Sequence, residues 1–159
     1  MDSYAPLLEK LRLPQPSLQR FAVTSIFSKL RAAPQHLNSD SGPGREAISQ
    51  CLLHSSPAVV DQSVRELCRL VKESYIDVSR ALMELQAALE GSESRFVDVF
   101  VKGLGFLVQF GFQKHNGSWQ FGSAETHPFV KVRGCSLKRL AEVTCLESIL
   151  IALCSNDVL

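Results

Sequence analysis

The side chains best suited to chemistry in this sequence are four histidines, and they are scattered along it. A zinc site needs three or four ligands brought together, and no histidine here belongs to a cluster of that size. We therefore predict surface histidines and no metal. The four are His36, His54, His115 and His127.

A glycine pair, Gly103 and Gly105, begins like the dinucleotide-binding pattern G-x-G-x-x-G. The third glycine would fall at position 108, where Val108 stands, and no strand is predicted before it. The phosphate-loop, zinc-protease, serine-hydrolase and EF-hand patterns do not occur either. We predict no catalytic residues, no cofactor and no enzymatic activity. The glycines instead indicate close packing against a neighbouring helix, since each weakens its own helix by about 1 kcal/mol relative to alanine.

Charged side chains between residues 56 and 91 form a candidate interaction surface. They fall mainly between apolar stripes, which is typical of the solvated face of a helix, and Glu66 and Arg69 form a supporting i, i+3 pair. A ridge that binds a partner protein is the alternative, since helical repeats often bind through such surfaces. The single tryptophan either packs onto the helices or anchors a partner. The candidate residues are Arg65, Glu66, Arg69, Lys72 and Trp119.

The segment from Ser56 to Gly91 contains those charged residues, and its apolar residues have helical spacing. The predicted helices determine where the charged side chains lie. The apolar residues recur at i, i+3, i+4 and i+7 in two stripes. We predict two helices with a break near Ser74, because an uncapped helix longer than about 25 residues is unusual; one long helix is the alternative. The stripes are Val60, Val64, Leu67, Cys68 and Val71, then Val78, Leu82, Leu85 and Leu89.

The same period returns in residues 18–30, 47–52, 97–108 and 137–153. One helix buries too little apolar surface to offset the entropy of ordering it, so the helices must stack. The sequence therefore predicts an all-α fold, a HEAT- or armadillo-like α-solenoid fragment. Such a fragment leaves an apolar edge that favours self-association or a partner.

The connections carry three further expectations. Residues 35–44 have turn chemistry and predict an exposed loop, and Gly91 is placed where a left-handed residue ends a helix. Asn116-Gly117 favours a type I′ turn, so residues 110–122 form either a small β-hairpin or an irregular loop.

Residues 96–112 are apolar almost all round. Asp98, Lys102 and Gln109 interrupt them, and the uncharged run is shorter than the roughly 20 residues that a bilayer requires. We favour a buried helix. A membrane-associated protein that uses residues 96–112 is the alternative function.

The balance of charge is nearly even, with 17 Lys+Arg against 16 Asp+Glu and a net charge of +1 over 159 residues. This balance favours neither nucleic acid nor an anionic membrane as a partner. The opening Met1-Asp2-Ser3-Tyr4 has an acid where a signal peptide needs basic residues. We expect a cytoplasmic protein whose partners are proteins.

Three strings are distinctive: RLPQPSLQRFAV at 12–23, VVDQSVRELCRLV at 59–71 and FVKGLGFL at 100–107. They resemble the N-terminal region of a family of large plant helical-repeat proteins related to animal focadhesin. The resemblance covers about residues 1–132, and residues 133–159 depart from it as a divergent C-terminal helix or tail. It implies a non-catalytic scaffold that links the cytoplasmic RNA exosome to its helicase complex in messenger RNA decay. The implied consequences are effects on gene silencing, cuticular wax and embryo development.

Overall fold

The computed structural model of the chain describes residues 4–38 and 42–114. Every regular element in these two stretches is a helix, so the all-α prediction is confirmed for them. The elements are α1 (Ala5–Arg12), α2 (Pro16–Ala32), α3 (Gln35–Asn38), α4 (Pro43–Leu52), α5 (Pro57–Lys72), α6 (Val78–Gly91), the 3₁₀ turn η1 (Ser94–Phe96) and α7 (Val97–Lys114).

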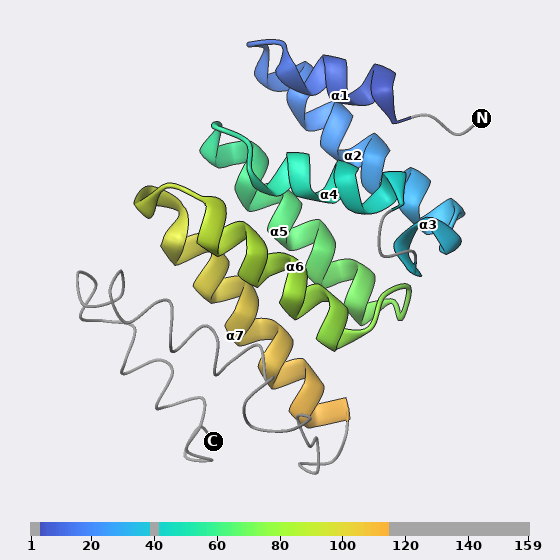
Figure 1. The fold of residues 1–159 in the computed structure, drawn as a ribbon, viewed down its shortest axis with the longest axis vertical. Coiled ribbons are helices and arrows are strands. Elements are labelled where there is room, and N and C mark those ends of the chain that lie inside the picture. The colour runs from blue at the N-terminus through green and yellow to red at the C-terminus, as the bar shows by residue number, and fades with distance from the viewer. Residues whose placement is uncertain (1–3, 39–41, 115–159) are drawn as a thin grey trace.

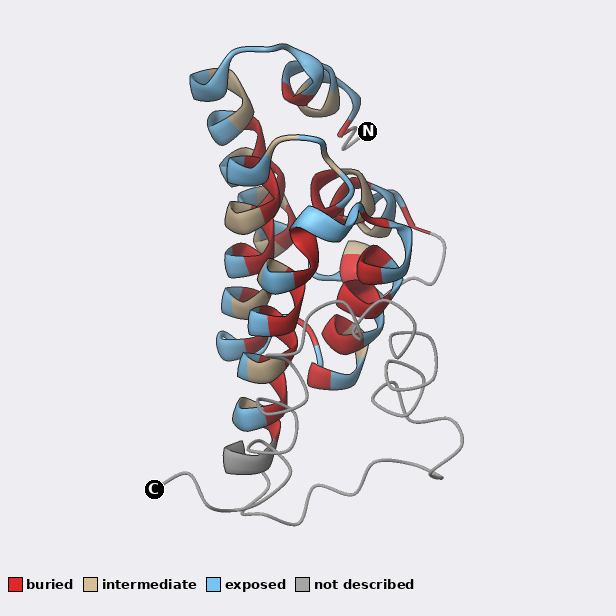
Figure 2. Cartoon of the chain, turned by 90° about the vertical axis from the view of Figure 1, so that its left-hand side faces the viewer, coloured by how far each residue is buried: buried red, intermediate tan, exposed pale blue. Residues whose placement is uncertain are grey.

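The helices pack in pairs that follow one another along the chain (Figure 1). Within each pair a short connection joins the two members: α1 to α2, α4 to α5, and α6 to α7. Across pairs, α2 packs on α5 and α5 on α7, while α1 packs on α4 and α4 on α6. We call these two rows the α2–α5–α7 layer and the α1–α4–α6 layer. The buried residues lie on the helix sides that face the interior, and the exposed residues lie along the outer sides (Figure 2).

The core lies between the two layers and contains the apolar stripes predicted from the sequence. Val60 and Leu67 of α5 are fully buried, as are Leu85 of α6 and Phe100 of α7. α5 is the central helix, because it packs against α2, α4, α6 and α7. Its periodic stripe therefore contacts apolar residues of both layers.

The break predicted near Ser74 is confirmed, since α5 ends at Lys72 and α6 begins at Val78. Ser74 adopts a left-handed backbone with φ of 64°. The N–H of Tyr75 donates to the carbonyl of Leu70 at 2.9 Å, and the N–H of Ser74 donates to Val71 at 3.0 Å. These two bonds form a Schellman motif, which ends the helix and reverses the chain.

Ser74→Gly should raise the free energy of unfolding by about 0.5–1 kcal/mol, because glycine adopts the left-handed conformation without a clash of its own Cβ. Thermal melts followed by circular dichroism would measure the change. Ser28→Gly, in the exposed interior of α2, should instead lower stability by about 0.5 kcal/mol. Equal effects of the two changes would contradict the assignment of the helix end.

Two predictions about connections were wrong. Residues 35–38 form α3 instead of an exposed loop, because Leu37 is 2% exposed and holds the segment against the core. Gly91 is not left-handed; it is the last residue of α6, and a Cβ there would lie 3.3 Å from Leu53 Cδ2. Its role is close packing against the end of α4.

The possible β-hairpin near 110–122 is not supported. α7 continues through Lys114, so residues 110–114 are helical, because the apolar helical period runs on past Val108. The remainder of that range lies outside the described residues. So do Trp119, the boundary at residue 132 and the tail of residues 133–159. Among the described residues, no helix combines the length and apolar character needed to cross a membrane.

Candidate functional site

A groove on the outer side of the α2–α5–α7 layer brings together three of the sequence-predicted surface residues. We call it the α5–α7 groove; its volume is about 380 Å³. Arg65, Arg69 and Lys72 line it from α5, and the opposite wall comes from α7. Its full lining is Asp61, Val64, Arg65, Cys68, Arg69, Lys72, Val99, Lys102, Gly103 and Phe106.

The groove exists because Gly103 lets α7 approach α5 closely. A Cβ at this position would lie 2.6 Å from Val64 Cγ1, which is shorter than real side chains allow, and 3.0 Å from Leu85 Cδ1, which is tighter than most real contacts. The close packing predicted for this glycine is therefore confirmed. Val99 and Phe106 lie about one turn before and one turn after Gly103 on α7. Their side chains form this wall of the groove.

The floor of the groove is apolar. The sulfur of Cys68 lies 4.0 Å from the carbonyl oxygen of Gly103. Burial raises the pKa of this thiol to about 12. The thiol is therefore protonated and behaves as a small apolar side chain. Phe106 is 41% exposed, although its ring stacks on Phe110 with a centroid distance of 6.2 Å. A large apolar ring is thus held at the surface in a fixed orientation.

The rim of the groove is cationic. Of the charged side chains that line it, Asp61 is the single carboxylate against four cations. Arg69 is paired with the buried Glu66 of its own helix. Two others have exposed partners within their own helix: Arg65 with Asp61 at 2.8 Å, and Lys102 with Asp98. Both pairs are well exposed, and exposed pairs contribute only about 0–1 kcal/mol. An incoming carboxylate can therefore compete for these cations at little cost.

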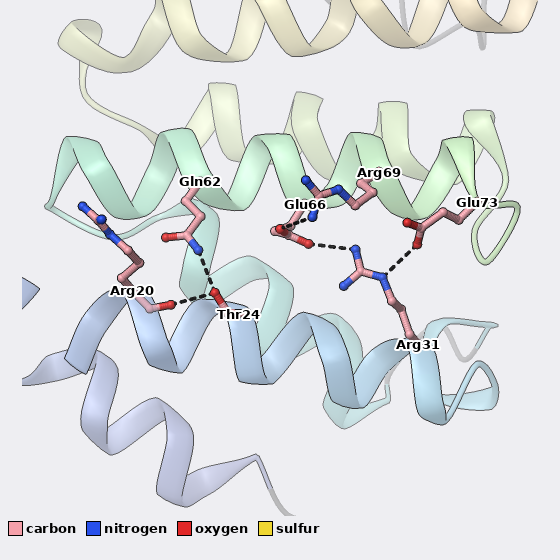
Figure 3. A network of polar contacts seen from close by, with 7 residues as sticks. All are labelled: Arg20, Thr24, Arg31, Gln62, Glu66, Arg69 and Glu73. Carbon is pink, nitrogen blue, oxygen red and sulfur yellow. Dashed lines mark hydrogen bonds and ion pairs between the residues drawn. The ribbon is translucent and has the colours of Figure 1, made fainter. Parts of the chain in front are cut away.

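Glu66 does not belong to the exposed surface, contrary to the prediction. It is 8% exposed and lies between α2 and α5 (Figure 3). Arg31 of α2 donates to its Oε2 at 2.8 Å, and Arg69 donates to its Oε1 at 3.0 Å. Arg31 also donates to Glu73 at 2.8 Å. The carboxylate is buried because cations from two helices satisfy it, which i, i+3 spacing along one helix could not reveal.

The carboxylates of Glu66 and Glu73 also shift the pKa of Arg31. Burial lowers the pKa of its guanidinium, but the hydrogen bonds to Glu66 and Glu73 outweigh that effect, and the pKa ends above its usual value. Arg31 therefore keeps its charge and links α2 to α5. Gln62 adds a neutral link in the same interface by donating to the Thr24 hydroxyl at 2.9 Å (Figure 3).

A second buried carboxylate occupies the corresponding place in the other layer. Glu84 of α6 is 4% exposed. Its Oε1 lies 2.9 Å from Arg45 Nε of α4 and 3.3 Å from Arg80 Nε of its own helix. In both layers, then, a buried glutamate pairs with one arginine from the preceding helix of that layer and one from its own.

Glu84→Gln should lower the free energy of unfolding by about 2 kcal/mol, because it removes the buried negative charge that pairs with both Arg45 and Arg80. The expected loss is below that of a fully buried pair because Arg45 is partly exposed. Urea denaturation would measure it. Glu90→Gln, on the exposed side of the same helix, is the control and should change stability by less than about 0.5 kcal/mol.

The described histidines have structural partners. The Tyr4 hydroxyl lies 3.0 Å from His36 Nδ1. The Nε2 atom of His54 lies 3.1 Å from the carbonyl oxygen of Leu11. The Nδ1 atom of the same ring accepts a hydrogen bond from the Ser56 N–H at 3.0 Å. Within residues 4–38 and 42–114, no three His, Cys, Asp or Glu side chains gather where they could hold a metal ion. His115 and His127 lie outside these residues.

The contribution of α7 to the groove was not recognised from the sequence. Lys102 and Phe106 were treated as part of a helix that is apolar all round, and not as the second wall of a site. One sign was available: Phe106 lies off the buried stripe of Val97, Phe100, Val101, Leu104, Leu107 and Val108. A large aromatic on the outer side of a helix is a candidate contact residue.

Comparisons of the chain with protein-family profiles, with curated proteins and with solved structures find no match.

Proposed function

We propose that this chain is part of a non-catalytic helical-repeat scaffold, HEAT- or armadillo-like, that binds other proteins. The observation that carries the proposal is the α5–α7 groove, an apolar floor with a cationic rim built across two successive helix pairs. Repeat proteins bind partners along surfaces formed in this way by equivalent helices of neighbouring units.

The two buried glutamates support the repeat interpretation. Arg31–Glu66 joins α2 to α5, and Arg45–Glu84 joins α4 to α6. Each ion pair connects one helix pair to the next within its own layer. Each junction between successive helix pairs thus contains one such ion pair, in one layer or the other, which supports a stack of similar units.

The sequence resemblance supplies the partners within this proposal. It favours a cytoplasmic adaptor between the RNA exosome and its helicase complex in messenger RNA decay, with no direct contact to nucleic acid. Under this proposal, effects on gene silencing, cuticular wax and embryo development follow from altered decay. The support for these partners is the set of strings at 12–23, 59–71 and 100–107.

Affinity purification from plant cytosol followed by mass spectrometry tests the proposal. Three baits are compared: the tagged chain, a version that ends at Val132, and the chain with Lys102→Glu and Phe106→Ala in the groove. Exosome or helicase-complex subunits should co-purify with the first two baits and be lost from the third. Recovery of only chaperones with all three would contradict the scaffold proposal.

A further inference from the structure

The α5–α7 groove has the shape of a site for a helix. Its lining on α5 runs from Asp61 to Lys72, eleven residue steps, which is a length of about 17 Å or three helical turns. Two parallel ridges of side chains bound it, one on α5 and one on α7. An amphipathic helix of similar length fits such a groove through apolar residues at i, i+3 or i+4, and i+7.

The charge pattern specifies what the flanks of that helix must carry. Arg65, Arg69 and Lys72 stand along one edge, and Lys102 stands across from them on the other. The side chains of Arg65, Arg69 and Lys102 are 76%, 59% and 75% exposed. Lys72 is exposed and has no ion pair among the described residues. Cations on both edges are complementary to acidic residues on both sides of an apolar stripe.

We propose that the α5–α7 groove binds an acidic amphipathic helix, whose apolar stripe covers Val64, Cys68 and Phe106 and whose Asp and Glu side chains pair with the rim. The inference rests on the proposed function as a protein-binding scaffold and names the class of partner that this site takes. A peptide is favoured over RNA because the floor is apolar.

A displayed library of helical 16-residue peptides, randomised at all surface positions and selected on the full chain, tests the proposal. The enriched peptides should carry Leu, Phe or Trp at i, i+3 or i+4, and i+7, flanked by Asp and Glu. Their affinity, measured by fluorescence anisotropy, should fall at least about tenfold with Arg65→Glu and Lys102→Glu together. It should also fall when NaCl is raised from about 0.05 to 0.5 M.

The matched control makes the same change in net charge away from the groove. Lys10→Glu and Arg12→Glu alter exposed positions on α1 and should leave the affinity of the enriched peptides unchanged within about twofold. Circular dichroism confirms that each variant is folded, which is expected because every altered side chain is exposed. Phe106→Ala is a second groove variant that removes apolar contact without changing charge, and it should weaken binding as well.

The contrary outcomes are distinct. Enriched peptides that are basic or uncharged yet depend on the groove would overturn the acidic partner and leave the scaffold function standing. Peptides insensitive to both groove variants would place binding elsewhere and overturn this site. Binding of a labelled single-stranded RNA in the groove, when no peptide binds there, would overturn the peptide assignment. So would a dimer, detected by light scattering, that the groove variants dissociate. No enrichment of any peptide, together with failed co-purification, would overturn the scaffold function as well.

Discussion

Replacing Leu67 with aspartate should unfold the described helices at 25 °C. Leu67 is fully buried on α5, the helix that packs against α2, α4, α6 and α7. The substitution removes a large apolar side chain and buries a carboxylate with no counter-charge, at a combined cost of about 6 kcal/mol or more. That cost approaches the whole stability of a small domain, about 5–15 kcal/mol. Circular dichroism should show loss of helical signal and of a cooperative melt.

Arg65→Asp is the matched control for this experiment. It places the same side chain on the same helix at a position whose native side chain is 76% exposed. The lost pair with Asp61 is a surface pair, so stability should change by less than about 1 kcal/mol. Equal melting temperatures for the two variants would mean that the buried side of α5 is wrongly assigned.

The second large effect concerns Gly103. Gly103→Val should lower the free energy of unfolding by about 3 kcal/mol, because its side chain would occupy the space of Val64 Cγ1 and Leu85 Cδ1. Separation of α7 from α5 would also deform the floor of the groove. Urea denaturation measures the loss, and the binding of a groove-dependent peptide would report the deformation.

A double-mutant cycle isolates the cause. Gly103→Ala and Val64→Ala should each destabilise, since the first creates a 2.6 Å clash and the second leaves a cavity. Together they should cost about 1 kcal/mol less than the sum of the single changes, because Val64→Ala removes the atom that the new Cβ meets. Strict additivity would show that Gly103 is required for another reason than contact with Val64.

The helices α2, α4, α5, α6 and α7 could be predicted from the sequence because each has a periodic apolar stripe with few interruptions. The two stripes of α5 and α6 have the right spacing, and the break between them needed no glycine. What could not be predicted is how the helix ends form. Ser74 takes the left-handed position in spite of its Cβ, whereas Gly91, which can adopt it freely, remains helical. Packing against Leu53 decides the use of Gly91, and that contact spans 38 residues of sequence.

The candidate site was predictable only along one helix at a time. Arg65, Arg69 and Lys72 follow from the polar face of α5, and they do line the groove. Glu66 has the same local spacing but is buried, because its partner Arg31 comes from α2, 35 residues earlier. Lys102 and Phe106 complete the groove from α7 by the same kind of long-range pairing. Periodicity assigns a residue to a side of its helix; it does not say which other helix meets that side.

The two layers expose different apolar side chains, and we expect these to differ in whether they contact the partner. The α1–α4–α6 layer exposes Met83 on α6, while the α2–α5–α7 layer exposes Phe106 on α7, at 47% and 41% of their surfaces. Phe106 lies in a groove with a cationic rim. If recognition depends on that combination, exposed apolar area alone should not attract the partner.

Site-specific photocrosslinking tests this claim most directly. A benzophenone amino acid is placed at position 106 in one sample and at position 83 in another, and each is irradiated in cytosolic extract. We predict a discrete protein adduct from position 106, reduced by Arg65→Glu with Lys102→Glu, and none of that mass from position 83. The same adducts from both positions, or adducts from position 83 alone, would contradict a partner site in the α5–α7 groove.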